Sequence, residues 1–413
     1  MADQFVRARS TAKLGRVDGE LSVGRGTTIK AESGKIIVAG RAYFDGEVTI
    51  DGDFECQSIR VEGKGFGPGG DVRINGSLTV EGSADIDASA RVSGSVKAGS
   101  LDVAGHFRSG MLKTDRLRVG GHLETRGSLD ANEVDVGGHM TVLDEVKILN
   151  LRVGGHAKIG GGSVKGDVRV RGHFGTTKKV AFGRLETYGN VALPSGSTGE
   201  RLTVLGRIEF EGDSFCKDLE VTGTAKARGN LSAENVNVKG NLFASGNLQV
   251  SKRFQVWGEA GISGALTCET LGVGGKLAAD SISASNRADI TGEVRAGRGL
   301  KSATVVVGRG SKVAGPIFAE SVEVGSEADF GSVWGLPWWR GALGSLTTVE
   351  DVHGGSVKLG SHSRAGHIFG RMVEVEEGAA AEEVVYTDQV KLPGRHSLSN
   401  PPRKVEELPG DSI

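Results

Sequence analysis

Histidine is the residue type whose spacing in this sequence first suggests chemistry. Five histidines recur at intervals of 16 and then 17 residues, at His106, His122, His139, His156 and His173. Imidazoles bind transition metals, but a metal site needs ligands that converge, whereas equal spacing predicts a flat row of side chains. The same position is later filled by other polar residues, namely Asn190, Arg207, Thr224 and Asn241. We therefore expect a solvated or mutually stacked surface row, and no metal or other cofactor.

The three cysteines are the next candidates for chemistry. Cys56, Cys216 and Cys268 are odd in number and far apart, which does not indicate a disulfide framework. Cys216 and Cys268 each lie ten residues after a recurring glycine, a position that otherwise holds Ala131, Ile148, Phe182, Ala233 and Val250. This predicts a buried column in which the cysteines are small core residues, and it disfavours a catalytic thiol.

Repeats that bind calcium or carry enzymatic activity have other patterns. Calcium-binding repeats of secreted β-helices have a period of about nine residues with a recurring aspartate, and no aspartate recurs in phase here. Polysaccharide-cleaving β-helices need paired carboxylates in a cleft built by large loops. Acyltransferases of the left-handed type repeat a hexapeptide, which gives a coil of about 18 residues. The short, even repeat of this chain predicts no cleft, so we expect no enzymatic activity.

The element behind these columns is an internal repeat of about 17 residues. One glycine, called here the phase glycine, recurs at Gly105, Gly121, Gly138, Gly155, Gly172, Gly189, Gly206, Gly223, Gly240, Gly258, Gly275 and Gly292. The residues four before and two after it are apolar in all twelve repeats, and the residue directly after it is polar. Alternation with a period of two predicts strands with one buried face.

Further breakers follow about six and eleven residues after many phase glycines, as at Gly127 and Asn132. Three corners in each repeat predict an all-β, single-stranded, three-sided β-helix, or β-solenoid, of about twenty coils. Glycine suits such corners because it reaches positive φ without steric cost. Parallel strands of successive coils should then pair about 4.8 Å apart.

The pattern divides the chain into unequal parts. We expect residues 1–14 to be a disordered or extended segment, residues 15–390 to be a continuous solenoid, and residues 391–413 to be a disordered, proline-rich tail. The net charge of −1 predicts no broad basic surface for nucleic acid. No apolar leader and no run of about 18 apolar residues is present. Together with the few cysteines, this favours a reducing cytoplasm, with membrane association left open.

The repeat fails most clearly between residues 330 and 346. This segment holds an aromatic cluster with a neighbouring cation: Trp334, Pro337, Trp338, Trp339 and Arg340. An exposed aromatic cluster predicts a contact with a protein partner or a membrane surface. A loop that folds back over the solenoid is an equally good interpretation.

Two stretches of the repeat resemble the bactofilins, a family of polymer-forming cytoskeletal proteins. They are VDGELSVGRGTTIKA (Val17–Ala31) and VEVEEGAAAEEVVYTDQV (Val373–Val390). The resemblance implies a right-handed triangular β-helix that polymerises without nucleotide through its terminal coils. It also implies a scaffolding role at the inner membrane or in cell shape. A typical member has a single domain of far fewer coils, so this chain looks like a long variant.

We therefore expect a filament-forming scaffold whose partner is a second copy of itself. Uncapped terminal coils favour end-to-end stacking. The expected polymerisation contacts are Val17, Leu21, Val23, Val373, Val375, Val384, Val385 and Tyr386. The alternative is a binding scaffold that does not polymerise and presents the tryptophan-rich segment to a protein or membrane partner.

Overall fold

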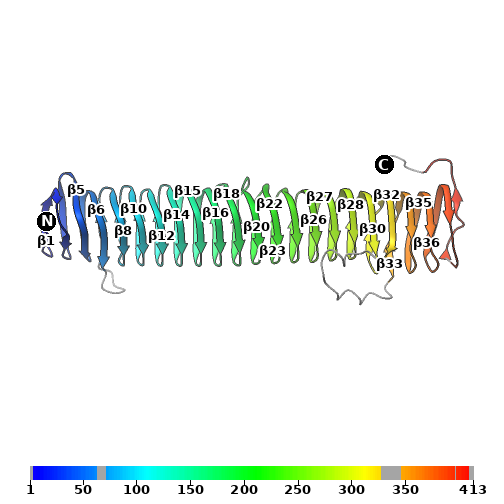
Figure 1. Cartoon of the computed structure of the whole chain (residues 1–413), viewed down its shortest axis with the longest axis horizontal. Coiled ribbons are helices and arrows are strands. Elements are labelled where there is room, and N and C mark those ends of the chain that lie inside the picture. The colour runs from blue at the N-terminus through cyan, green and yellow to red at the C-terminus, as the bar shows by residue number, and fades with distance from the viewer. Residues whose placement is uncertain (1–2, 63–70, 327–345, 396, 409–413) are drawn as a thin grey trace. The chain divides into compact units, whose positions relative to one another are not determined.

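The computed structural model describes residues 3–62, 71–326, 346–395 and 397–408, and every regular element in these ranges is a strand (Figure 1). Parallel strands about 17 residues apart stack into a β-solenoid of about 22 turns, which confirms the predicted fold class. The chain divides into two compact units. One comprises residues 1–201 and 206–208, and the other comprises residues 202–205 and 209–413.

The described residues of the first unit form nineteen complete strands. They are β1 (Gln4–Val6), β2 (Thr11–Leu14), β3 (Arg16–Val17), β4 (Leu21–Val23), β5 (Thr27–Asp45), β6 (Val48–Glu62), β7 (Val72–Ile74), β8 (Leu78–Ile86), β9 (Ala90–Val92), β10 (Val96–Val103), β11 (His106–Ser109), β12 (Leu112–Val119), β13 (His122–Thr125), β14 (Leu129–Val136), β15 (His139–Val153), β16 (His156–Val170), β17 (His173–Thr176), β18 (Val180–Thr187) and β19 (Asn190–Leu193). Residues of both units occur in β20 (Thr198–Val204) and β21 (Arg207–Phe210).

The second unit continues with strands of the same kind. They are β22 (Ser214–Val221), β23 (Thr224–Ala227), β24 (Leu231–Val238), β25 (Asn241–Ala244), β26 (Leu248–Val256), β27 (Glu259–Val273), β28 (Lys276–Ile290), β29 (Glu293–Ala296), β30 (Leu300–Gly308), β31 (Lys312–Ala314), β32 (Ile317–Ser326), β33 (Thr347–Val349), β34 (Val352–Leu359), β35 (Ser363–Val375), β36 (Ala380–Lys391), β37 (Ser397–Leu398) and β38 (Arg403–Lys404).

One coil of the first unit shows why the solenoid is three-sided. Strand β11 pairs with β13 along one side. Strand β12 pairs with β14 in two runs, Leu112–Thr114 and Arg116–Val119, which are separated by the unpaired Asp115. These three runs are the three sides, and inward residues such as Leu117 are buried. The alternation of buried and exposed residues therefore places each apolar column in the interior.

The phase glycines are needed because successive coils approach closely. A Cβ on Gly138 would lie 2.1 Å from the carbonyl oxygen of Gly121, and one on Gly155 would lie 2.1 Å from that of Gly138. Neither glycine has a positive φ. The sequence interpretation gave conformational freedom as the reason for these glycines, and the structure corrects it, because the turn-to-turn contact leaves no room for a side chain.

In the second unit, side chains also stabilise one corner of successive coils. The Oδ1 atom of Asp213 accepts the backbone N–H of Asn230 at 2.7 Å. In turn, Asn230 Oδ1 accepts the N–H of Asn247 at 2.9 Å, and Asn247 Oδ1 accepts the N–H of Ala265 at 2.8 Å. Each polar side chain thus satisfies a backbone donor of the next coil, a role that suits Asn and Asp.

Both ends of the solenoid extend beyond the predicted limits. Residues 4–14 were expected outside it, but β1 pairs with β4 and β2 pairs with β5, both in parallel. Residues 391–413 were expected to be disordered, but β37 and β38 pair in parallel with β36. The structure thus corrects both boundaries. These end strands contain two to four residues, which is too short for alternation to reveal them.

Candidate functional site

The apolar residues predicted as end contacts are buried. At the N-terminal side, Val17, Leu21 and Val23 are 3, 0 and 1% exposed. The C-terminal group of Val373, Val375, Val384 and Val385 is buried as well, and only Tyr386 is partly exposed. These side chains are therefore placed to hold the coils together, and surface contacts at the ends must come from other groups.

The first coil offers backbone edges instead. Among the described strands, β1 pairs only with β4, while β2 and β3 pair only with β5. Val17 belongs to this first coil. Leu21 and Val23 lie in the second coil, where they pair with Gln4 and Val6 of β1. Phe5, at the centre of β1, is 70% exposed. The sequence interpretation missed Phe5, although an outward-facing aromatic residue in a short alternating segment was a usable signal.

The last coil is only partly covered. Strands β37 and β38 pair with two sides of β36, through Ala380 and Ala381 and through Val385 and Tyr386. The third side of β36, residues 389–391, pairs with residues 372–374 of β35. No described strand pairs with the other edge of residues 389–391.

Hydrogen bonds and an ion pair hold the described part of the final segment on the solenoid. Ser397 donates its backbone N–H to the carbonyl oxygen of Ala379 at 3.0 Å, and Val405 donates to that of Tyr386 at 2.9 Å. Arg403 forms an ion pair of 3.4 Å with Glu383. Since β37 and β38 contain two residues each, this segment is a short final coil with exposed edges.

The histidine row is stacked, as the sequence predicts. From His106 to His173 the ring centroids of neighbours lie 4.6 to 4.9 Å apart, and from His122 onward the planes are within 9° of parallel. Asn190 continues the row, with its Nδ2 atom 3.1 Å from His173 Nε2. Parallel rings do not aim their nitrogens at a common point, and the described residues contain no group of three His, Cys, Asp or Glu that could hold a metal ion.

The stacking also affects proton binding. Desolvation by burial lowers the pKa of His122, and the neighbouring rings of His106 and His139 lower it further. Adjacent imidazolium ions with ring centroids 4.6 Å apart would repel one another. His122 is therefore expected to resist protonation.

His353 and His367, in the second unit, have different surroundings. His353 stacks between Phe318 and Phe369, with centroid distances of 4.9 and 4.7 Å, and burial lowers its pKa. His367 places its Nδ1 atom 2.8 Å from a carboxylate oxygen of Asp351. That hydrogen bond raises the pKa of His367.

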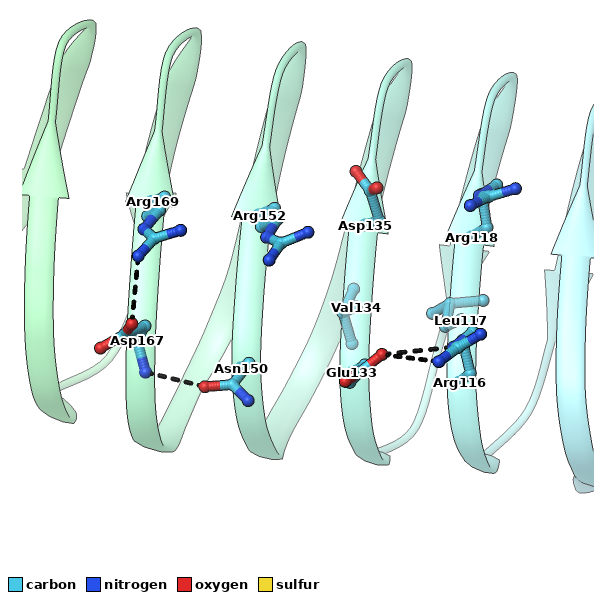
Figure 2. Close-up of a pocket in the computed structure, with 10 residues that line it drawn as sticks. All are labelled: Arg116, Leu117, Arg118, Glu133, Val134, Asp135, Asn150, Arg152, Asp167 and Arg169. Atoms are coloured by element: carbon cyan, nitrogen blue, oxygen red, sulfur yellow. Dashed lines mark hydrogen bonds and ion pairs between the residues drawn. The ribbon is translucent and has the colours of Figure 1, made fainter.

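A shallow groove of about 400 Å³ lies on one face of the first unit (Figure 2). Two rows of polar side chains from β12, β14, β15 and β16 border it, and Leu117 and Val134 lie between the rows. Arg116 pairs with Glu133 at 3.2 Å, and Arg169 pairs with Asp167 at 3.5 Å. Glu133 and Asp167 are thus each ion-paired with an arginine of the same face. This arrangement does not resemble a carboxylate pair that acts as general acid and general base.

The cysteines are core residues, as predicted. Cys56, Cys216 and Cys268 are free thiols and are buried. Burial raises the pKa of each to about 12, so the thiolate form needed for nucleophilic chemistry is disfavoured.

The tryptophan-rich segment lies outside the described residues. The predicted contact residues Trp334, Pro337, Trp338, Trp339 and Arg340 lie within residues 327–345. The prediction that this segment contacts a partner or a membrane therefore stays a prediction.

Comparisons with protein-family models, curated proteins and solved structures found no match. Within the described ranges there is also no helix long and apolar enough to cross a membrane. The resemblance to bactofilins therefore remains an expectation from the repeat pattern. The feature that invites a functional interpretation is the pair of partly unpaired end coils.

Proposed function

We propose that this chain is a structural scaffold whose copies join end to end into filaments without nucleotide. The observation that supports this best is the first coil, where β1, β2 and β3 each have a described partner on one side only. Unpaired strand edges readily accept another strand. The bactofilin-like repeat implies the same type of assembly.

The sides of the solenoid give less support for a function. Each interior strand of the described residues has a neighbour on both edges, and the groove over Leu117 and Val134 is bordered by charged residues, among which Arg116 pairs with Glu133 and Arg169 pairs with Asp167. We therefore favour a cytoskeletal scaffold with itself as partner over an enzyme. A cytoplasmic location is part of the same proposal.

Electron microscopy and sedimentation of the purified full-length protein test the proposal. Negative-stain images should show filaments, and the sedimented fraction should rise with protein concentration in the absence of nucleotide. Addition of ATP or GTP should leave that fraction unchanged. Particles of one size, with no sedimentation at any concentration or salt tested, would refute end-to-end assembly.

A further inference from the structure

One side of the first unit carries a row of charged side chains, called here the charge row. Its members are Arg60, Asp85, Asp102, Arg118, Asp135, Arg152, Arg169 and Glu186. Each member pairs with the next on the following coil, so the row is unbroken over eight coils. None of these residues is buried, and Figure 2 shows the middle of the row, from Arg118 to Arg169.

The order of charges in this row is unchanged when it is read backwards with every sign inverted. Forwards, the charges are positive, negative, negative, positive, negative, positive, positive and negative. The point of inversion lies between the coils of β12 and β14. Like charges stand side by side at two steps, Asp85 to Asp102 and Arg152 to Arg169. Such neighbours are destabilising within one chain, yet the two steps lie at equal distances from the point of inversion.

Ion pairs within the chain engage the middle of the row weakly. Arg118 lies 3.8 Å from Asp102, and Arg169 lies 3.5 and 3.9 Å from two carboxylates, whereas a strong ion pair measures about 2.7 to 2.9 Å. Among the described residues, neither Asp135 nor Arg152 forms an ion pair. The row therefore has charges that a second molecule can neutralise.

We propose that two copies of this chain associate side by side and antiparallel through the charge row. A two-fold axis that lies in the contact plane, parallel to the strands and between β12 and β14, places each row against the other in reverse order. The residues that then face one another across the contact are Arg118 with Asp135, Asp102 with Arg152, Asp85 with Arg169, and Arg60 with Glu186. All eight contacts join opposite charges. The contact uses a side of the solenoid, so it is independent of end-to-end assembly.

The neighbouring row of polar side chains agrees with the same axis. It runs through Ser100, Arg116, Glu133 and Asn150 on successive coils. The axis places Arg116 against Glu133 of the second copy, and Ser100 against Asn150. The first pair has opposite charges. In the second, Asn150 uses its Oδ1 atom for the backbone N–H of Asp167 at 3.0 Å, which leaves its amide N–H groups to donate to the serine hydroxyl.

Other arrangements of the same two faces bring like charges together. A two-fold axis along the solenoid would make the copies parallel and place Arg118 against Arg116 and Asp135 against Glu133. An antiparallel axis moved by half the coil spacing, through the coil of Asp135, would place that residue against its own copy and Arg118 against Arg152. The charge pattern therefore favours one orientation and one register.

The size of the contact indicates weak association. Eight coils about 4.8 Å apart, each four residues wide at about 3.3 Å, cover roughly 500 Å² of each copy. A stable interface buries about 800 Å² per partner. Exposed ion pairs contribute little individually and are screened by salt. We therefore expect a dimer that forms at low salt and dissociates at high salt.

Reversal of single charges tests the register. In a dimer of Arg118→Glu chains, both contacts with Asp135 join like charges, and in a dimer of Asp135→Arg chains both contacts with Arg118 do. In a mixed dimer of the two variants, each of these contacts joins opposite charges again. Lys113→Glu and Asp130→Arg are the matched controls, because these residues form an ion pair of 3.4 Å between the same two strands on another side of the solenoid.

Sedimentation velocity of the full-length chains, over a series of protein concentrations, measures the association. It is run at about 0.1 M and about 1 M salt, where the Debye length falls from about 10 Å to about 3 Å. At the lower salt, the wild-type protein and both controls should form a species of twice the chain mass. Each charge-row variant alone should raise the dissociation constant about tenfold or more, and the mixture should return it to the wild-type value. At the higher salt, all dimers should dissociate.

Three outcomes would overturn the side-by-side contact. They are wild-type association in either charge-row variant alone, a mixture that stays dissociated although circular dichroism shows folded chains, and a wild-type protein without charge-dependent association. Negative-stain images separate this result from end-to-end assembly. Single filaments that are equally abundant in all chains and never paired would refute the side contact and leave end-to-end assembly standing.

Discussion

Interior coils and end coils of this solenoid differ in what their strands leave unpaired. Strand β12 has β10 on one edge and β14 on the other, so its backbone groups have partners on both sides. Strand β1 has β4 on one edge and no described strand on the other. The same repeat therefore yields interior strands that are paired on both edges and end strands that are paired on one edge only, because pairing is complete only where a coil has two neighbours.

Interior coils approach one another closely at some glycines and less closely at others. A Cβ on Gly138 would lie 2.1 Å from the carbonyl oxygen of Gly121. A Cβ on the neighbouring Gly137 would have its nearest atom, the carbonyl oxygen of Val119, at 3.6 Å. Gly378 has no atom within 4 Å of such a Cβ, but its φ of 78° disfavours a side chain there. Interior packing therefore tolerates changes at some glycines and not at others.

The largest expected effect comes from Gly138→Ala. The added methyl group must separate two coils that are paired along their whole length, so we expect a loss of about 3 kcal/mol in the free energy of unfolding. Gly137→Ala in the same coil is the matched control, with an expected change within about 0.5 kcal/mol. Urea denaturation followed by circular dichroism measures both. Equal losses would show that the close contact does not determine the choice of glycine.

Proline substitutions compare the end coil with the coil beneath it. Ser22 lies between Phe5 and Tyr43 in one column, so its strand is paired on both edges. Ser22→Pro removes a ladder hydrogen bond and should cost about 3 kcal/mol. Phe5→Pro removes an N–H that points away from the second coil, so its cost should stay below about 1 kcal/mol.

Assembly should respond in the opposite order. Phe5→Pro should abolish sedimentation while leaving the melting temperature almost unchanged, because it blocks the free edge only. Phe5→Ala keeps the N–H and should retain part of the sedimentation. If Phe5→Pro assembles as well as the wild-type protein, the edge of β1 is not the contact surface.

The interior of the fold was predictable from sequence because each column repeats many times. Residues such as Leu117, Val134 and Leu151 occupy one predicted apolar column, and all three are buried. The stacking of His122 on His139 and the burial of the cysteines follow from the same register. Because each apolar column is repeated in many coils, a single exception does not prevent its recognition in the sequence.

The ends were not predictable in the same way. Strands β37 and β38 have two residues each, and alternation needs more than two residues to be visible. The end contacts were assigned to apolar residues such as Val17 and Val384, but apolar residues in phase are the buried ones. The groups left free are backbone groups of the end strands and the outward-facing Phe5. Whether a strand edge is paired depends on which strands lie beside it in the fold, and a single sequence does not show this.

The smallest expected effects are changes of stability with pH. They compare a histidine of the first unit, His122, with one of the second, His367. Burial and the neighbouring rings lower the folded-state pKa of His122, so the unfolded chain binds its proton more readily. Stability is then complete above the unfolded pKa of about 6.5 and falls as pH drops below it. Asparagine already occurs in this row at Asn190. His122→Asn should therefore reduce the loss of folding stability between about pH 7.5 and pH 5.5.

His367 should show the opposite sign. Its hydrogen bond to Asp351 raises the folded-state pKa, so it contributes stability below the unfolded pKa, and that contribution is lost as pH rises through the folded pKa. His367→Asn should therefore destabilise the protein more at about pH 5.5 than at about pH 7.5. Both effects should remain below about 1 kcal/mol, since His122 is exposed and the side chain of His367 is half-buried. Urea midpoints at the two pH values measure them, and slopes of the same sign for the two variants would contradict the assignment of opposite pKa shifts.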